Sequence, residues 1–176
     1  MRALAAAALA VLAGCASKDA ALSDWERANA QREATEEVVA PPQYPEGASL
    51  SEFAVRDAAG FRYFVDSATL AVGKDGVVRY VLVARSPEGV ENVTYEGLRC
   101  ESAEQRVYAL GHRDRTWSPA RGDWRRIVQP RHVALAREYF CPQNEPIRTA
   151  DEGRRALQGG GHPFSKGFGG EFGRGR

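Results

Sequence analysis

The stretch Val77-Val78-Arg79-Tyr80-Val81-Leu82-Val83-Ala84 decides the fold class. Apart from Arg79, its residues are apolar or aromatic at both alternating positions of a strand. A strand that is apolar on both faces is covered on both sides, so this stretch predicts a central strand of a sheet.

Turn residues bound this strand and repeat along the neighbouring sequence. Lys74-Asp75-Gly76 precedes it and Ser86-Pro87-Glu88-Gly89 follows it, and both have the composition of tight turns. Short connections join antiparallel neighbours, so we expect an antiparallel meander. The predicted strands cover residues 51–56, 61–65, 69–73, 77–85, 91–99 and 105–111.

One helix is predicted to cover a face of this sheet. Over residues 130–140 an apolar face recurs at helical spacing, formed by His132, Leu135, Ala136, Tyr139 and Phe140. On that face, His132 is interpreted as a hydrogen-bonded core histidine in preference to a catalytic base. The predicted fold is an α+β domain over residues 46–157, with an antiparallel sheet of about five to six strands packed by a C-terminal helix.

The first 14 residues have the pattern of an export signal. Arg2 precedes the apolar run 3–13, which as a helix is about 16 Å long, too short for a bilayer core of about 30 Å. Leu12-Ala13-Gly14-Cys15 resembles the bacterial lipobox, which implies cleavage before Cys15 and its lipidation. By the same resemblance, Ala16 in place of Asp implies the outer membrane, with the domain facing the periplasm. A soluble periplasmic protein is the alternative.

The two regions that flank the domain have little apolar sequence. Residues 15–45 are expected to form a tether with one weak helix. Ser23 caps the start of this helix, which runs to about residue 38, and prolines 41, 42 and 45 prevent it from continuing. Residues 158–176 are rich in glycine and are expected to be a disordered tail.

The charge of the chain argues against general binding to nucleic acid. Without Arg2, the chain carries 23 basic and 23 acidic side chains. The charge is nevertheless uneven: residues 15–60 hold four basic and nine acidic groups, whereas residues 101–131 hold seven basic and four acidic groups. A local basic surface is therefore compatible with the sequence.

Two cysteines remain in the domain, Cys100 and Cys141, which are 41 residues apart. In an oxidising compartment an even pair most often forms a disulfide, and closing this span is worth about 4 kcal/mol in the chain-entropy model. A redox pair or a metal site is the alternative, but the Cys-x-x-Cys spacing of those sites is absent.

The sequence contains no recognisable catalytic motif, and neither a cofactor nor a metal is expected. His112-Arg113-Asp114 resembles a kinase catalytic loop, yet Pro119 stands where that loop needs asparagine. One hypothesis for the function, the alternative to the binding or structural role given below, is a small periplasmic hydrolase that uses a pair of strand carboxylates. The candidates for that pair are Asp66, Asp75, Glu91 and Glu96.

The segment 113–131 is the best candidate for a ligand surface. Guanidinium groups bind phosphate or carboxylate, and indole rings stack on sugars or on arginine. The candidate residues are Arg113, Arg115, Trp117, Arg121, Trp124, Arg125 and Arg126, with an anionic envelope ligand or an envelope protein as the expected partner. The simpler interpretation is that both tryptophans anchor the core and the arginines form a solvated face.

Several stretches of the chain resemble the CNP1-like family of small exported proteins of Gram-negative bacteria. They are Tyr63-Phe64-Val65-Asp66, Val72-Gly73-Lys74-Asp75-Gly76-Val77-Val78-Arg79-Tyr80, Tyr95-Glu96-Gly97-Leu98-Arg99-Cys100, Trp117, Trp124 and Glu138-Tyr139-Phe140-Cys141. The resemblance covers about residues 44–157. It agrees with export and with the two cysteines, and it implies no assigned activity or catalytic residue. We therefore expect a non-enzymatic binding or structural protein of the cell envelope, held to the membrane through Cys15.

Overall fold

The computed structural model describes residues 23–34, 36–37, 39–56 and 60–165. The predicted signal peptide, Cys15 and the end of the chain from residue 166 lie outside the described residues. The chain divides into two compact units, residues 1–36 and residues 37–176. Within the described part of the chain, no helix is both long and apolar enough to cross a membrane.

The first unit contains the helix α1, Asp24–Ala34. The predicted cap at Ser23 is present, because its Oγ accepts a hydrogen bond from the Glu26 N–H and its own N–H donates to the Glu26 carboxylate. These reciprocal bonds satisfy two backbone donors at the helix start. The helix ends at Ala34, earlier than the predicted end near residue 38.

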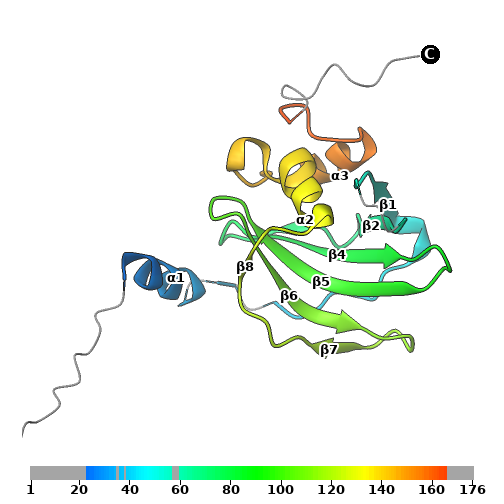
Figure 1. Cartoon of the computed structure of the whole chain (residues 1–176), viewed down its shortest axis with the longest axis horizontal. Helices are drawn as coiled ribbons and strands as arrows, with labels where there is room; N and C mark the ends of the chain where they lie inside the picture. The colour runs from blue at the N-terminus through cyan, green and yellow to red at the C-terminus, as the bar shows by residue number, and fades with distance from the viewer. Residues whose placement is uncertain (1–22, 35, 38, 57–59, 166–176) are drawn as a thin grey trace, which may run out of the picture. The chain divides into compact units, whose positions relative to one another are not determined.

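The second unit is built on one antiparallel sheet, which confirms the α+β class (Figure 1). The order of its strands is β1-β2-β4-β5-β6-β7, with β3 paired to β4 and β8 paired to β6. The sheet has eight strands, more than predicted, because β7 and β8 were not expected. The strands are β1 Leu50–Phe53, β2 Arg62–Asp66, β3 Ala71–Val72, β4 Val78–Arg85, β5 Glu91–Arg99, β6 Glu104–Gly111, β7 Trp117–Pro119 and β8 Arg125–Arg126.

The layer of helices lies on one side of the sheet (Figure 1). It consists of α2 Pro130–Ala134, η2 Leu135–Phe140, η3 Pro142–Asn144 and α3 Ala150–Gln158. The single helix predicted over residues 130–140 is therefore two segments, since η2 is a π-helix in which the Cys141 N–H donates to the Ala136 carbonyl. Helix α3 was not predicted from the sequence. Thr149 caps it by accepting a hydrogen bond from the Glu152 N–H.

The central strand β4 is buried on both sides, as its sequence predicts. On the helix face, Tyr80 and Leu82 pack with Leu135 and Phe140 of η2. On the opposite face, Val81 and Val83 belong to a second cluster, to which Val39 and Tyr44 contribute. We call the segment of residues 37 and 39–46 the arm, and the side of the sheet that it covers the arm face. The folded unit thus begins before residue 46, the boundary expected from the sequence.

Two predicted features of the core are confirmed. Cys100 and Cys141 form a disulfide that joins the end of β5 to the end of η2. His132 is a core histidine: it is 1 % exposed, and its Nε2 lies 2.8 Å from the Glu96 carboxylate.

The glycine-rich tail is ordered at its start, which corrects the prediction of disorder from residue 158. The N–H of His162 donates to the Glu138 carbonyl, and its Nε2 lies 3.0 Å from the Glu152 carboxylate. The ring is 3 % exposed, so it anchors residues 159–165 against the helices. Residues 159–165 are ordered because they pack on the helices, and the composition of the tail alone does not predict that contact.

Candidate ligand surface

The two tryptophans of the predicted ligand surface are packed against the protein. Trp124 is 8 % exposed, and the Arg99 guanidinium lies 4.0 Å from its ring centroid. Trp117 is half-buried: its Nε1 donates to the Pro42 carbonyl over 3.0 Å, and its ring lies 5.2 Å from that of Tyr44. Trp117 thus fastens the arm to the sheet.

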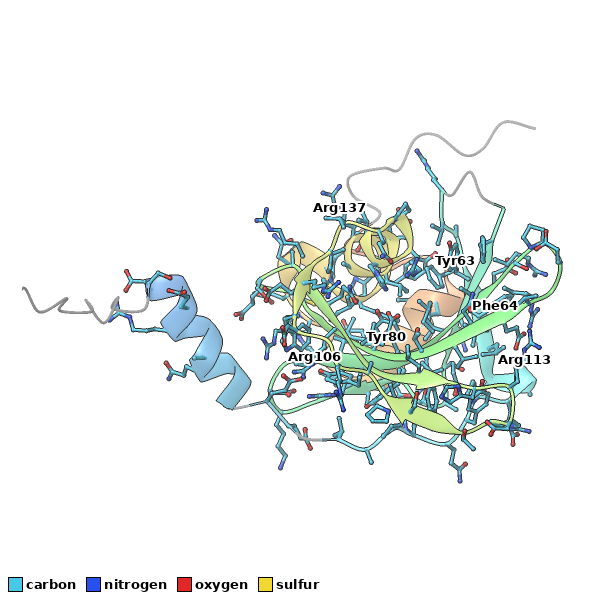
Figure 2. The ribbon with its side chains drawn as sticks, turned by 60° about the horizontal axis from the view of Figure 1, so that its bottom comes forward. Tyr63, Phe64, Tyr80, Arg106, Arg113 and Arg137 are labelled. Carbon is cyan, nitrogen blue, oxygen red and sulfur yellow. A yellow bond between two sulfur atoms is a disulfide. The ribbon has the colours of Figure 1, made fainter. Side chains whose placement is uncertain are left out.

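The arginines of the predicted surface fall into two groups at opposite ends of β6. Arg113 and Arg115 lie in the turn after β6, whereas β8 pairs with the start of β6, with Arg125 opposite Gln105. At about 3.3 Å per residue, the groups are roughly 20 Å apart. Figure 2 shows this separation through the labels of Arg113 and of Arg106, which lies next to Gln105. The seven candidate residues therefore do not form one continuous patch.

An arginine–aromatic cluster lies at the β8 end, and most of its residues were not predicted from the sequence. The Tyr108 ring lies 5.7 Å from the guanidinium of Arg79 and 5.6 Å from that of Arg106. Its centroid is also 6.3 Å from that of Trp124, in an edge-on arrangement. Such contacts fix guanidinium groups over ring faces, so the cluster holds this end of the sheet in one arrangement.

A β-bulge positions Tyr108 within this cluster. Between β5 and β6, Tyr95 pairs with Ala109 while Glu96 pairs with Val107, which leaves Tyr108 as the extra residue. The ring of Tyr108 then lies against Gly97, where an added Cβ would come within 2.8 Å of it. The strand alternation of the sequence could have placed Arg79, Arg99 and Arg106 on one face, but nothing in the sequence signalled the bulge.

Arg79 is the buried end of the cluster and carries a countercharge. Its side chain is 2 % exposed, and it donates to both carboxylate oxygens of Asp75 and to the Glu37 carbonyl of the arm. Burial raises the pKa of Asp75, but the hydrogen bonds from Arg79 and from the N–H groups of Glu37 and Val77 outweigh it and lower this pKa overall. Arg79, the one charged residue in the otherwise apolar stretch 77–84, therefore binds the arm to the sheet.

Three arginines at this end face solvent. The side chains of Arg121, Arg125 and Arg126 are exposed and make no ion pair or hydrogen bond with the residues that the structure describes. We call these three residues the basic edge. Together with Arg99 and Arg106, these arginines outnumber the carboxylates at the same end, which are those of Glu101, Glu104 and Asp123. The basic edge can therefore accept an anion without first breaking an ion pair within the described chain.

The helix face holds a second buried charge. The Glu96 carboxylate accepts hydrogen bonds from the hydroxyls of Tyr80 and Thr94, over 3.1 and 2.7 Å, in addition to its contact with His132. Burial raises the pKa of Glu96, but the hydrogen bond and the charge of His132 outweigh it and lower this pKa overall.

The four carboxylates considered for a hydrolase each have a separate environment. Asp75 and Glu96 belong to the two faces just described, and Glu91 forms an exposed ion pair with Arg85. Asp66 accepts a hydrogen bond from the Ala68 N–H at the end of β2. Among the described residues, no group of three histidine, cysteine or acidic side chains is arranged to hold a metal ion.

These features define an α+β protein in which an antiparallel sheet lies between a disulfide-linked layer of helices and an N-terminal arm. The chain belongs to the CNP1-like family, whose sequence model matches residues 29–158, from within α1 to the end of α3. The resemblance predicted from the sequence is thereby confirmed, and the match begins earlier than residue 44. No curated protein and no solved structure matches the chain.

Proposed function

We propose that this protein is a lipid-anchored lipoprotein of the outer membrane that faces the periplasm and binds an anionic envelope ligand without catalysing a reaction. Two features support export. The sequence around Cys15 resembles a lipobox, and the domain contains a disulfide, which persists in oxidising compartments such as the periplasm. Several acyl chains at about 0.8 kcal/mol per buried CH₂ would hold such a protein on a membrane.

The observation that carries the binding proposal is the basic edge. Its three guanidinium groups are unpaired within the described chain, and the strand β8, which carries Arg125 and Arg126, lies beside the arginine–aromatic cluster. Arginine is well suited to phosphate and carboxylate because it donates through a planar fork. The ligand class is therefore an exposed phosphate or carboxylate of the envelope, such as that of an anionic lipid or of lipopolysaccharide.

The test uses a charge reversal with a matched control. In Arg125→Glu/Arg126→Glu, binding to vesicles that contain phosphatidylglycerol, and to lipopolysaccharide, is expected to be lost. In Arg113→Glu/Arg115→Glu, which makes the same charge change at the other end of β6, binding should be nearly retained. Wild-type binding should weaken as salt rises, because exposed charges are screened within about 10 Å at 0.1 M. Equal loss in both variants would indicate general charge attraction and would contradict a site at the basic edge.

The anchor is tested separately. Cys15→Ser is expected to abolish labelling with radioactive palmitate and to release the protein from the membrane fraction, while Cys100→Ser should leave the label in place. Ala16→Asp should move the labelled protein from the outer to the inner membrane on a density gradient. Unlabelled wild-type protein would contradict the anchor without bearing on the basic edge.

A further inference from the structure

The arm borders a partly open pocket near β1 and β2, strands that lie at the other end of the strand order from β6 and β8. The pocket has a volume of about 550 Å³ and lies between residues 42–49 and the connection from β2 to β3. This volume is within the range of about 300–1,000 Å³ found for small-molecule sites. Its lining is largely small and apolar, with Pro42, Ala68, Leu70 and Ala71 among its residues.

Asp66 contributes a buried carboxyl group to the lining of the pocket. The residue is 2 % exposed, and its Oδ1 accepts the Ala68 N–H, an ordinary turn contact that uses one carboxylate oxygen. No donor among the described residues binds the other oxygen, Oδ2. Oδ2 is not one of the fully buried polar atoms that lack a partner, so it is reachable from the pocket that Asp66 lines. A ligand donor could therefore bind this oxygen and meet the hydrogen-bonding capacity of the carboxylate.

The rest of the lining contains no cation to neutralise Asp66. Glu46 lines the pocket as a second carboxylate; its side chain is 80 % exposed, and its ion pair with Arg115 is long, at 3.9 Å. Arg154, which lies close by, is already bound to the Ser67 carbonyl and to Asp151. An anionic ligand would therefore meet the Asp66 carboxylate and, near it, that of Glu46, whose ion pair with Arg115 is long and exposed.

We propose that this pocket binds a small organic cation, a primary ammonium carried on a short apolar body. The apolar body would replace water against Pro42, Leu70 and the alanines, and the ammonium would donate to Asp66. A second ammonium on the same ligand would reach Glu46 at the mouth. This proposal concerns a different ligand charge and a different site from the basic edge and does not depend on it.

The test compares four probes that share a five-carbon body: pentylamine, 1,5-diaminopentane, 1-pentanol and pentanoate. Binding to the full chain is followed by calorimetry and by amide chemical shifts of residues 66–71. Both amines are expected to bind saturably, the diamine about tenfold more tightly, whereas the alcohol and the acid should not saturate over the same range. Equal binding of pentylamine and pentanol would show an apolar groove only and would overturn the proposal.

Variants separate the two carboxylates from general charge effects. Asp66→Asn should weaken both amines about tenfold or more, and Glu46→Gln should remove only the advantage of the diamine. Glu101→Gln, at an exposed position of the β5–β6 turn, is the matched control and should leave binding unchanged. Because Asp66→Asn also alters a turn, Ala68→Trp is a second test that fills the pocket and keeps the carboxylate. Normal amine binding in both Asp66→Asn and Ala68→Trp would overturn the proposal.

Discussion

Each face of the sheet buries one hydrogen-bonded pair of an acidic and a basic side chain, and the two pairs attach different covering layers to the sheet. On the helix face, Glu96 of β5 binds His132 of α2, and both side chains are at most 2 % exposed. On the arm face, Arg79 of β4 binds Asp75 and the Glu37 backbone. Buried ion pairs are rarely a net source of stability, but removing one partner is costly. Their value here is specific placement: each pair fixes one covering layer on the sheet.

The two faces differ in how strongly their covering layer is held. The helix layer is also joined to β5 by the disulfide and contributes buried aromatic and aliphatic residues, whereas the arm contributes only Val39 and Tyr44 to its apolar cluster. We therefore expect changes on the helix face to lower global stability and changes on the arm face to act more locally.

The largest effect is expected from the disulfide. Cys141→Ser should lower the free energy of unfolding by about 4 kcal/mol, since a cross-link over 41 residues restricts the unfolded chain. Urea denaturation of the wild-type protein with and without reductant gives the same comparison without a mutation. Two alkylatable thiols at residues 100 and 141 in protein isolated from the periplasm would contradict the disulfide.

The next effect concerns the buried pair of the helix face. His132→Ala should lower the free energy of unfolding by about 3 kcal/mol, because it leaves the Glu96 carboxylate buried with only the hydroxyls of Tyr80 and Thr94. His132→Gln, which keeps a donor, should lose less. If the two variants are equally stable, lost packing explains the loss and the hydrogen bond to Glu96 does not.

The corresponding change on the arm face should be smaller. Arg79→Met is expected to cost about 2 kcal/mol, because Asp75 keeps hydrogen bonds from the Glu37 and Val77 N–H groups. The loss should be local, with faster proteolytic cleavage within residues 37–46 before global unfolding. Cleavage in the helix layer first would contradict the assignment of Arg79 to the arm.

Acid should lower the stability that the buried carboxylates of both faces provide. The contribution of Glu96 on the helix face can be measured by comparing the wild-type protein with a variant that lacks this carboxylate. The folded pKa of Glu96 is lowered from its ordinary value of 4.5, so its contribution is fully present above pH 4.5 and is lost as the pH falls through the folded pKa. The difference in unfolding free energy between wild type and Glu96→Gln should therefore shrink as the pH falls below 4.5, as measured by urea denaturation at pH 7, 5, 4 and 3. A difference that is constant or grows towards acid would contradict the sign of this shift.

The sequence predicted the parts of this structure that depend on local pattern. The two-sided apolar run predicted β4, and Asp75-Gly76 predicted a turn in which Gly76 has a φ of 74°. In contrast, β7 and β8 are only three and two residues long and depend on pairing with β6. The helix α3 was missed although Thr149 and Glu152 stand at capping-box spacing, a local signal that was available.

The candidate site was predictable only in composition. The local excess of arginine in residues 101–131 located the basic edge, but it also suggested one patch where β6 separates two groups. The partners of Trp117 and Trp124, the Pro42 carbonyl and the Arg99 guanidinium, come from distant parts of the chain. Composition cannot supply those contacts, because they depend on the sheet register and on a bulge.

The smallest effect is expected at Arg85. A variant at this position tests whether Arg79 holds the arm because it is buried or because of the type of contacts that it makes. Arg85 makes a similar set of contacts, an ion pair with Glu91 and a position 4.7 Å from the Phe64 ring centroid, but its side chain is 33 % exposed. Water solvates both charges there, and an exposed pair is worth at most about 1 kcal/mol. Arg85→Met should therefore change the free energy of unfolding by less than about 1 kcal/mol and leave cleavage of the arm unchanged. If Arg85→Met instead costs as much as Arg79→Met, then contact with an aromatic ring stabilises both arginines, and the buried pair on the arm face has no special part in holding the arm.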